Sequence, residues 1–433
     1  MIGITEKTKS KTGLSEFHAE LADFSEFGAK TIVEQRNFGE TIVPVYQNEF
    51  WTAKQRCGHS IHEISYRACY KPQLPKFFIE RLTRKNDVVY DPFLGRGTTL
   101  IEANLLGRKV VGNDINPLSE ILTVPRLSPP NIFEIKQRID EVNLEQISCE
   151  GSELLVFFNS QTLSEILSWR NYFAERRGNN KFDKIDAWIE MVGCNRLTGH
   201  SKGFFSVYTL PPNQAASVKS QQRINEKRGQ TPDYRDTKEI LYRKSHQLLR
   251  EKLPLNYGQK LFQINIGSAD STAEIKTESV DLIVTSPPFL DIVNYQQDNW
   301  LRMWFTDVSV EEKACWQIKN LCDWLDKMQS AFQEFYRVLK PLGVIAFEVG
   351  EIRKGNLLLE NEIVKIASEV GFTANCILIN AQNFTKTANC WGVKNNQEGT
   401  NTNRIVILTK NEANDFAFYT PRSISSFQQP TLF

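Results

Sequence analysis

A short polar and proline-rich segment, Thr285-Ser286-Pro287-Pro288-Phe289, directly follows the apolar run Val280-Asp281-Leu282-Ile283-Val284. The apolar run predicts a buried strand, so the segment lies at the carboxyl end of that strand. Open α/β sheets bind ligands at this edge. The Ser286 hydroxyl and the backbone carbonyls are hydrogen-bond acceptors, and the Phe289 ring offers a surface for stacking. We therefore interpret the segment as a ligand site.

A glycine-rich turn forms a second candidate site earlier in the chain. Residues 87–91 predict a strand, Gly95 and Gly97 a turn, and Thr98 the start of a helix. Glycine adopts backbone angles that are closed to other residues, and it lets a ligand approach the main chain. The amino terminus of the helix adds unpaired N–H groups and a partial positive charge, which suit a carboxylate.

Acidic residues follow two further predicted strands. The strand over residues 109–113 ends at Asp114, about twenty residues after the glycine turn, where an acid accepts hydrogen bonds from ribose hydroxyls. Residues 262–266 predict another strand, and Asp270 follows it. Each pattern alone also fits a structural connection, a stiffened loop or a helix cap. Their coincidence in one chain favours a functional interpretation.

The pairing of the two motifs resembles the S-adenosylmethionine-dependent methyltransferases that modify exocyclic amines of DNA bases. The resemblance covers roughly residues 60–120 and 260–410. It implies an α/β fold with the Rossmann-like, seven-stranded sheet of class I methyltransferases. We expect the strands at 376–379 and 404–408 to close this sheet as an antiparallel hairpin, and we expect helices over 324–339 and 359–370.

The resemblance implies that the cofactor is S-adenosylmethionine. It implies that nine residues bind this cofactor: Asp91, Phe93, Gly95, Gly97, Thr98, Asp114, Ile115, Asp270 and Thr285. It implies that Asp114 binds the ribose, that Ile115 packs on the adenine and that Asp270 binds the adenine amino group. Residues 70–78 resemble the family segment that closes the methionine pocket. Arg96 departs from the pattern, since the family often has Ser there.

The same resemblance implies that Ser286, Pro287, Pro288 and Phe289 are catalytic and act on a base flipped out of the duplex. Hydrogen bonds to Ser286 Oγ and the Pro287 carbonyl would draw the amine toward tetrahedral geometry. Ser-Pro-Pro is commoner among cytosine-N4 enzymes, so we favour cytosine N4 over the adenine-N6 alternative. An RNA amino-methyltransferase shares the motif order, but residues 1–60 look short for its RNA-binding domain. The intact motifs disfavour a non-catalytic nucleic-acid-binding module.

The two motifs lie about 185 residues apart, far more than a crossover connection requires. We therefore predict an N-terminal arm over 1–50, a first catalytic part over 51–130, an inserted target-recognition region over 131–258 and a second catalytic part over 259–433. Apolar residues at helical spacing make the insertion mainly helical.

A local excess of basic residues within the insertion favours contact with nucleic acid. Ten Lys or Arg residues lie between Lys219 and Lys252 against five acids, with tyrosines interleaved. We assign Arg223, Lys227 and Arg228 to double-stranded DNA; the alternative is a solvated helical face. A second proline pair, Pro211-Pro212, follows a β-rich run at 203–207, and we expect it in a loop that approaches the target groove.

Composition fits a cytoplasmic enzyme. The chain of 433 residues is 41% hydrophobic and 24% charged, with net charge +1, and it has no run of eighteen apolar residues and no signal-peptide core. The eight cysteines are scattered, as free thiols are. The spacing of Cys57, His59, His62 and Cys69 fits no common zinc pattern, so we expect no metal and interpret His62-Glu63 as a hydrogen-bonded pair. A restriction endonuclease is a candidate partner.

Overall fold

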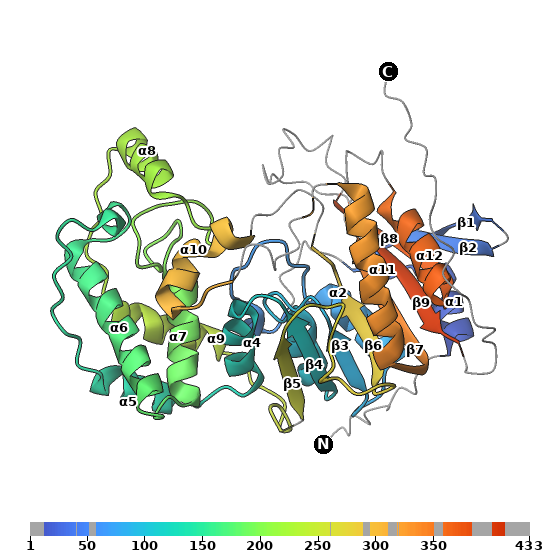
Figure 1. The fold of residues 1–433 in the computed structure, drawn as a ribbon, viewed down its shortest axis with the longest axis horizontal. Helices are drawn as coiled ribbons and strands as arrows, with labels where there is room; N and C mark the ends of the chain where they lie inside the picture. Colours follow the sequence, from blue (N-terminus) through green and yellow to red (C-terminus); the bar gives the residue numbers. More distant parts are fainter. Residues whose placement is uncertain are drawn as a thin grey trace.

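The computed structural model describes residues 13–39, 41–51, 58–259, 261–288, 295–310, 318, 320–349, 358–382 and 401–411. Figure 1 shows two lobes side by side, one built on a sheet and the other on helices from the middle of the chain. No helix in these ranges is both long and apolar enough to cross a membrane.

A mixed sheet forms the centre of the first lobe. Its strands are β1 (Ile32–Phe38), β2 (Thr41–Asn48), β3 (Val88–Asp91), β4 (Lys109–Asp114), β5 (Phe262–Ile266), β6 (Val280–Thr285), β7 (Leu339–Val349), β8 (Phe372–Gln382) and β9 (Asn401–Lys410). They lie in the order β1-β2-β8-β9-β7-β6-β3-β4-β5, and β7, β6, β3, β4 and β5 are parallel. From β3 the chain runs outward to β4 and β5 and then returns to β6 on the other side of β3. The strand order therefore reverses between β3 and β6, which is where such sheets bind ligands.

The seven predicted strands are present, and β8 and β9 are antiparallel as expected. Two further strands extend the sheet, because β2 pairs in parallel with β8 and β1 pairs with β2. The sequence predicted only an arm over residues 1–50. The exposed side chains of β1 leave it without a periodic apolar face, and the partner of β2 lies more than 300 residues away along the chain.

Helices cover both faces of the sheet. Along β6, Leu282 and Val284 join the apolar cluster on one face, whereas Ile283 joins the cluster on the other. The first face packs against α1 (Leu14–Asp23), α2 (Gln73–Leu82), α3 (Thr98–Leu105) and α4 (Leu118–Leu127). The second packs against α11 (Leu321–Val338) and α12 (Leu359–Val370), the latter with its predicted bounds.

The second lobe contains α5 (Ile132–Glu141), α6 (Ser160–Gly178), α7 (Lys184–Arg196), α8 (Val218–Arg228) and α9 (Thr237–Leu248). Helix α10 (Tyr295–Thr306) joins them although it follows β6 in the chain (Figure 1). The Trp300 indole donates a hydrogen bond to the Ala216 carbonyl (3.1 Å), and Phe305 packs edge-on against Phe173. The helical lobe therefore extends beyond the predicted insertion.

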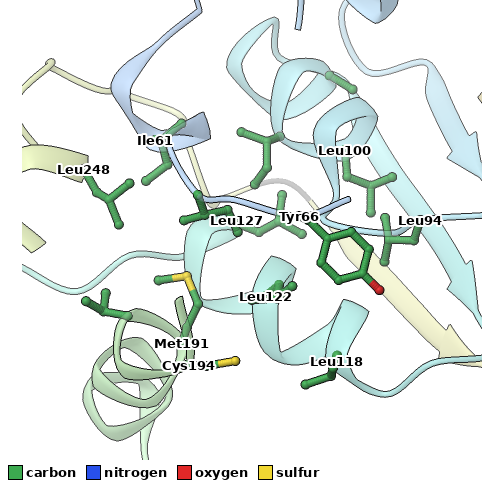
Figure 2. Close-up of a cluster of buried hydrophobic side chains, with 14 of the residues drawn as sticks. Ile61, Tyr66, Leu94, Leu100, Leu118, Leu122, Leu127, Met191, Cys194 and Leu248 are labelled. Carbon is green, nitrogen blue, oxygen red and sulfur yellow. The ribbon is translucent and has the colours of Figure 1, made fainter. Parts of the chain in front are cut away.

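The two lobes share one apolar core. Figure 2 shows Met191 and Cys194 of α7 beside Leu118 and Leu122 of α4, the helix that follows β4. Leu248 of α9 lies near Ile61 in the same cluster. The helical lobe is thus packed directly on the sheet lobe.

The β-rich run expected at residues 203–207 is wrong. These residues form turns and bends, with one isolated bridge between Gly199 and Tyr208. The Phe205 amide donates to the Arg196 carbonyl and the Val207 amide to the Phe157 carbonyl, so the backbone bonds to two separate elements. The apolar side chains of this run are buried in the helical lobe. None of the described residues there forms a strand with which the run could pair.

Candidate active site

A cavity of about 880 Å³, including its open mouth, lies at the carboxyl ends of β3, β4 and β6. Nine predicted site residues line it: Asp91, Phe93, Gly95, Thr98, Asp114, Ile115, Ser286, Pro287 and Pro288. The two motifs, about 185 residues apart in the chain, therefore meet at the switch point of the sheet.

Asp91 ends β3 at the floor of the cavity and is almost fully buried. One carboxylate oxygen accepts hydrogen bonds from the Thr285 hydroxyl (2.6 Å) and the Phe93 amide (3.2 Å), and the other accepts from the Tyr70 hydroxyl (3.0 Å). Burial raises the pKa of Asp91 to about 6, although these hydrogen bonds act in the opposite direction. Thr285 does not line the cavity, but its hydroxyl holds the Asp91 carboxylate in place through this hydrogen bond.

Tyr70 and Thr99 complete this network. The Tyr70 hydroxyl contacts the Thr99 hydroxyl, which is also 3.1 Å from the Val284 carbonyl. Thus α3, β3, β6 and the segment before α2 are tied together below the cavity. The sequence pointed to the segment that begins at Tyr70 but missed Thr99, whose signal was a second hydroxyl at the start of α3.

The Asp114 carboxylate joins the glycine turn to the end of β4. One oxygen accepts from the Gly95 amide (2.7 Å) and the other from the Asn116 amide (2.9 Å). Burial raises the pKa of Asp114, and these backbone bonds oppose the shift. Asp114 therefore fixes the turn as well as lining the cavity.

Gly97 lies behind the cavity wall and sets the start of α3. It is the N-cap of this helix, in the left-handed region with φ 74°. A Cβ atom at this position would lie 2.4 Å from Thr123 Oγ1. Only glycine therefore allows α3 to approach α4 this closely.

Arg96, the residue that departs from the family pattern, holds the cavity wall. Its guanidinium donates to the carbonyls of Ile64 (2.6 Å) and Tyr70 (3.4 Å), and its Nε donates to Thr98 Oγ1 (3.2 Å). Residues 66–70 line the cavity. A long cation thus bridges the glycine turn and this segment, which a serine could not span.

The Ser-Pro-Pro segment also lines the cavity. The Trp324 indole donates to the Pro288 carbonyl (3.0 Å) and fixes the end of the segment against α11. Glu348 of β7, a buried carboxylate that the sequence did not reveal, neighbours Ser286, because Thr285 of β6 pairs with Phe347 of β7. Phe289 lies outside the described residues, and its assignment stays a prediction.

Asp270 does not line the cavity. Its carboxylate accepts from Lys327 Nζ (3.2 Å), whereas Gly267, Ser268 and Ala269 line the cavity just before it. Its assignment to the adenine amino group stays a prediction.

The three predicted DNA-binding residues, Arg223, Lys227 and Arg228, lie on α8 and are exposed. Helix α8 projects from the helical lobe (Figure 1). The Arg228 guanidinium stacks 3.8 Å from the centre of the exposed Tyr208 ring. These residues therefore form a basic and aromatic surface that is separate from the cavity.

The predicted His62-Glu63 pair is wrong. His62 Nε2 lies 2.9 Å from a Glu102 carboxylate oxygen of α3, because the short turn at Ser60–His62 directs the ring into the core. Glu63 points outward and pairs with Arg250 (2.9 Å). Cys57 lies outside the described residues, and those that are described contain no group of three or more potential metal ligands.

Comparisons with known proteins match both the glycine-turn region and the wider chain. The family model described as DNA methylase matches residues 6–121. The chain is 25% identical to Type II methyltransferase M.MvaI of Kocuria varians over 278 residues, which cover 58% of each protein. It is 39% identical to Type II methyltransferase M.BsoBI of Geobacillus stearothermophilus over 125 residues, 28% of this chain and 21% of that one.

The matched regions thus span less than two thirds of these relatives. A solved SAM-dependent methyltransferase from Methanosarcina mazei is 10% identical, with 76% of this chain and 94% of that chain covered and a TM-score of 0.29. The family match over residues 6–121 and the two curated relatives support an amino-methyltransferase of the N4/N6 DNA methylase family.

Proposed function

We propose that the chain transfers a methyl group from S-adenosylmethionine to the exocyclic amine of a flipped-out DNA base, with cytosine N4 as the preferred acceptor. One observation carries this proposal. The acceptor groups of Ser286 and the two prolines line the same cavity as Asp91, Gly95 and Asp114. A methyl donor and an amine can therefore be held together in one site.

The residues present fit the cofactor. Asp91 is a buried carboxylate that accepts hydrogen bonds from hydroxyls and one amide, and it forms no ion pair with a cation in the described part of the chain. A bound ammonium group, such as that of a methionine moiety, would compensate its charge. Asp114 would accept from ribose hydroxyls, and Ile115 would contact the adenine. When bound, S-adenosylmethionine supplies a methyl group activated by the sulfonium.

The chain's own contribution is the placement of the acceptor amine. An aromatic amine is a poor nucleophile, because its lone pair is delocalised into the ring. Ser286 Oγ and the Pro287 carbonyl would accept its two hydrogens and direct the lone pair toward the methyl group. Alignment of reacting groups contributes up to roughly 7–11 kcal/mol to lowering a barrier. The packing of the segment against Trp324 keeps these acceptors in place.

DNA is the substrate that the family and the helical lobe favour. Both curated relatives described above are named Type II methyltransferases, which supports a role in restriction-modification beside a cognate endonuclease. The basic surface of α8 supports contact with DNA phosphates. The choice of cytosine over adenine rests on Ser286, since Asp or Asn is commoner there in adenine-N6 enzymes.

Mass spectrometry of nucleosides tests the proposal. DNA and RNA are isolated from cells that express the wild-type chain or the Ser286→Ala variant, and both are digested to nucleosides. We expect N4-methylcytosine in DNA with the wild type and none with the variant. N6-methyladenine instead would move the preference to adenine, and a product in RNA alone would overturn the DNA substrate.

A further inference from the structure

Two buried cations of the helical lobe, Arg196 of α7 and Lys244 of α9, have no anionic partner. They are 9% and 6% exposed, and no carboxylate of the described residues lies within ion-pair distance of either. Lys410, the other buried lysine in the described ranges, is paired with Glu278 (2.9 Å). A buried charge without a counter-ion is costly. Its presence calls for an anion from outside the chain.

Both cations also have hydrogen-bond donors available for a ligand. An ammonium has three donors, and Lys244 uses one of them on Gln247 Oε1 (3.1 Å). Arg196 donates from Nε and Nη2 to the carbonyl and the side chain of its neighbour Asn195 (3.0 and 2.8 Å), but its Nη1 bonds to no described residue. Buried Arg126 differs, because its guanidinium donates to three backbone carbonyls of other residues. Arg126 is therefore a structural cation, whereas Arg196 and Lys244 are not satisfied by the chain.

One short segment connects the two cations to the wall of the cavity. Gln247, which accepts on α9, donates from Nε2 to Glu63 Oε2 (3.0 Å). Asn195, which accepts on α7, donates to the Ser65 carbonyl (3.0 Å). Residues 66–70 follow directly and line the cavity. Because α7 and α9 also pack on each other, the two cations lie close together behind this wall.

Further cations strengthen the positive charge of the site. Arg302 of α10 donates to the same Ser65 carbonyl as Asn195 (3.1 Å), so its guanidinium lies beside that of Arg196. Exposed Arg243 of α9 donates to the carbonyl of exposed Lys202 (3.4 Å) and brings a charge to the outer edge. The positive charge thus continues from the buried pair to the surface of the helical lobe.

We propose that Arg196 and Lys244 bind a backbone phosphate of duplex DNA next to the target nucleotide. The inference rests on the proposed function and deepens it, because a base held in the cavity brings its flanking phosphates to the cavity wall. A phosphate oxygen accepts charge-assisted hydrogen bonds from both cations. The exposed cations at the edge, Arg243 and Lys202, favour a polyanion over a single small anion. This phosphate site is separate from the basic surface of α8.

Phosphate binding should be coupled to the uptake of a proton by Lys244. Burial, followed by the charge of Arg196, lowers the pKa of Lys244 to about 7. Glu63 and Arg250 also face Lys244, and they are paired with each other (2.9 Å). Arg196 keeps its charge at neutral pH, since its own lowered pKa is about 9. A phosphate favours the charged lysine, so DNA affinity should fall by about tenfold between pH 6 and pH 8.

Calorimetric titration of the full-length protein with a duplex that the wild type methylates tests the inference. We expect Lys244→Met to weaken binding by about 10-fold or more at pH 6. Lys244→Arg should keep the affinity at pH 6 and lose the pH dependence, because a guanidinium stays charged. Titration at pH 8 in two buffers of different ionisation enthalpy measures the proton uptake, which should occur in the wild type and in neither variant.

Lys238→Met is a matched control on the same helix. Lys238 also lacks an ion pair in the described part of the chain, but it donates to the carbonyls of Asp140 and Val142 (3.3 and 2.6 Å). This variant should keep the wild-type DNA affinity and proton uptake. Wild-type affinity in Lys244→Met, or an unchanged pH dependence in Lys244→Arg, would overturn the inference while the proposed function stands. If Lys244→Met fails to fold, Lys244→Arg decides the question.

Two further measurements identify the ligand. The melting temperature of Lys244→Met at pH 6 should equal or exceed that of the wild type, because an unpaired buried charge has been removed. Inorganic phosphate, titrated in place of the duplex, should cause no proton uptake at the concentrations at which the duplex does. Proton uptake with inorganic phosphate but not with the duplex would overturn the assignment to DNA. A wild type that methylates no DNA would overturn the proposed function, and this inference with it.

Discussion

Asp91 makes the stability of the sheet lobe depend on pH. Its folded pKa of about 6 lies above the usual aspartate value near 3.9, because burial disfavours the charge. The folded state therefore binds the proton more tightly. The stability that this proton confers is fully present below about pH 4 and is lost as the pH rises through 6, an effect of about 3 kcal/mol.

The comparison of wild type with Asp91→Asn isolates this effect, since asparagine does not titrate. We expect the free energy of unfolding of the wild type, relative to the variant, to fall by about 3 kcal/mol between pH 4 and pH 7. Urea unfolding at several pH values measures it. Parallel pH curves for the two proteins would show that Asp91 does not titrate in this range. Saturating S-adenosylmethionine should reduce the fall if its ammonium group binds Asp91.

Asp114 holds the glycine turn and, in the proposed function, also binds the cofactor, so its substitution should reveal both parts. We expect Asp114→Ala to weaken S-adenosylmethionine binding by about 1–3 kcal/mol, because ribose hydroxyls lose their acceptor. The amides of Gly95 and Asn116 lose theirs as well, so the melting temperature should also fall. Calorimetry of binding, together with thermal unfolding, measures both effects. Wild-type affinity in the variant would remove Asp114 from the cofactor site.

At the scale of elements, the geometry of the site depends on how closely α3 approaches α4. Gly97 and Gly151 have the same φ of 74°. A Cβ atom added at Gly97 would overlap Thr123, whereas a Cβ atom added at Gly151 would have no other atom within 4 Å. The pair therefore separates backbone strain from steric overlap. Gly151→Ala should cost roughly 1–2 kcal/mol, the penalty of a left-handed residue.

Gly97→Ala should cost more than this strain alone, and it should also weaken cofactor binding, because α3 must move. Adding Thr123→Ala should recover part of the loss by removing the overlap. Chemical unfolding and calorimetry of the single and double variants measure the effects. Equal costs at Gly97 and Gly151, with intact cofactor binding, would contradict a packing role for Gly97.

The sequence predicted those elements whose pattern is local. Leu359–Val370 has a continuous helical apolar stripe and ends at a left-handed glycine, Gly371, so its bounds could be predicted to the residue. The strands β3, β4 and β6 were found because motifs mark their ends. The pairing of β2 with β8 and the move of α10 into the helical lobe depend on residues far apart in the chain, and no local pattern carries them.

The same distinction applies to the candidate site. Asp91, Gly95, Asp114 and Ser286 could be predicted, since each occupies a fixed place after a strand. The supporting residues were missed. Glu348 is a single acid within an apolar strand, and only strand register brings it to Ser286.

At the scale of the whole molecule, the wall of the cavity is held from both lobes. Arg96 bonds residues of segment 64–70 from the sheet lobe. From the helical lobe, Asp298 of α10 pairs with Arg67 (2.7 Å), and Asn195 of α7 donates to the Ser65 carbonyl (3.0 Å). Under the proposed function, a shift of the helical lobe on DNA would be transmitted to this wall, and recognition would be linked mechanically to cofactor binding.

The basic surface of α8 gives the last prediction. Exchanging Arg223, Lys227 and Arg228 together for alanine should weaken DNA binding. The steepness of the plot of log affinity against log salt concentration should decrease by about 0.9 for each phosphate contact that is lost, for up to about three contacts. S-adenosylmethionine affinity should not change, because α8 does not line the cavity. Filter binding across a range of salt concentrations measures the slope.

A matched control removes three exposed cations from the sheet lobe, Lys30, Arg84 and Lys109, which gives the same change in net charge. We expect this variant to keep the wild-type salt slope, because long-range attraction alone is screened within about 10 Å at 0.1 M salt. Equal losses in both variants would mean that net charge, rather than α8, governs the affinity. An unchanged slope in the α8 variant would make this surface a solvated face, and DNA recognition would then have to come from other elements.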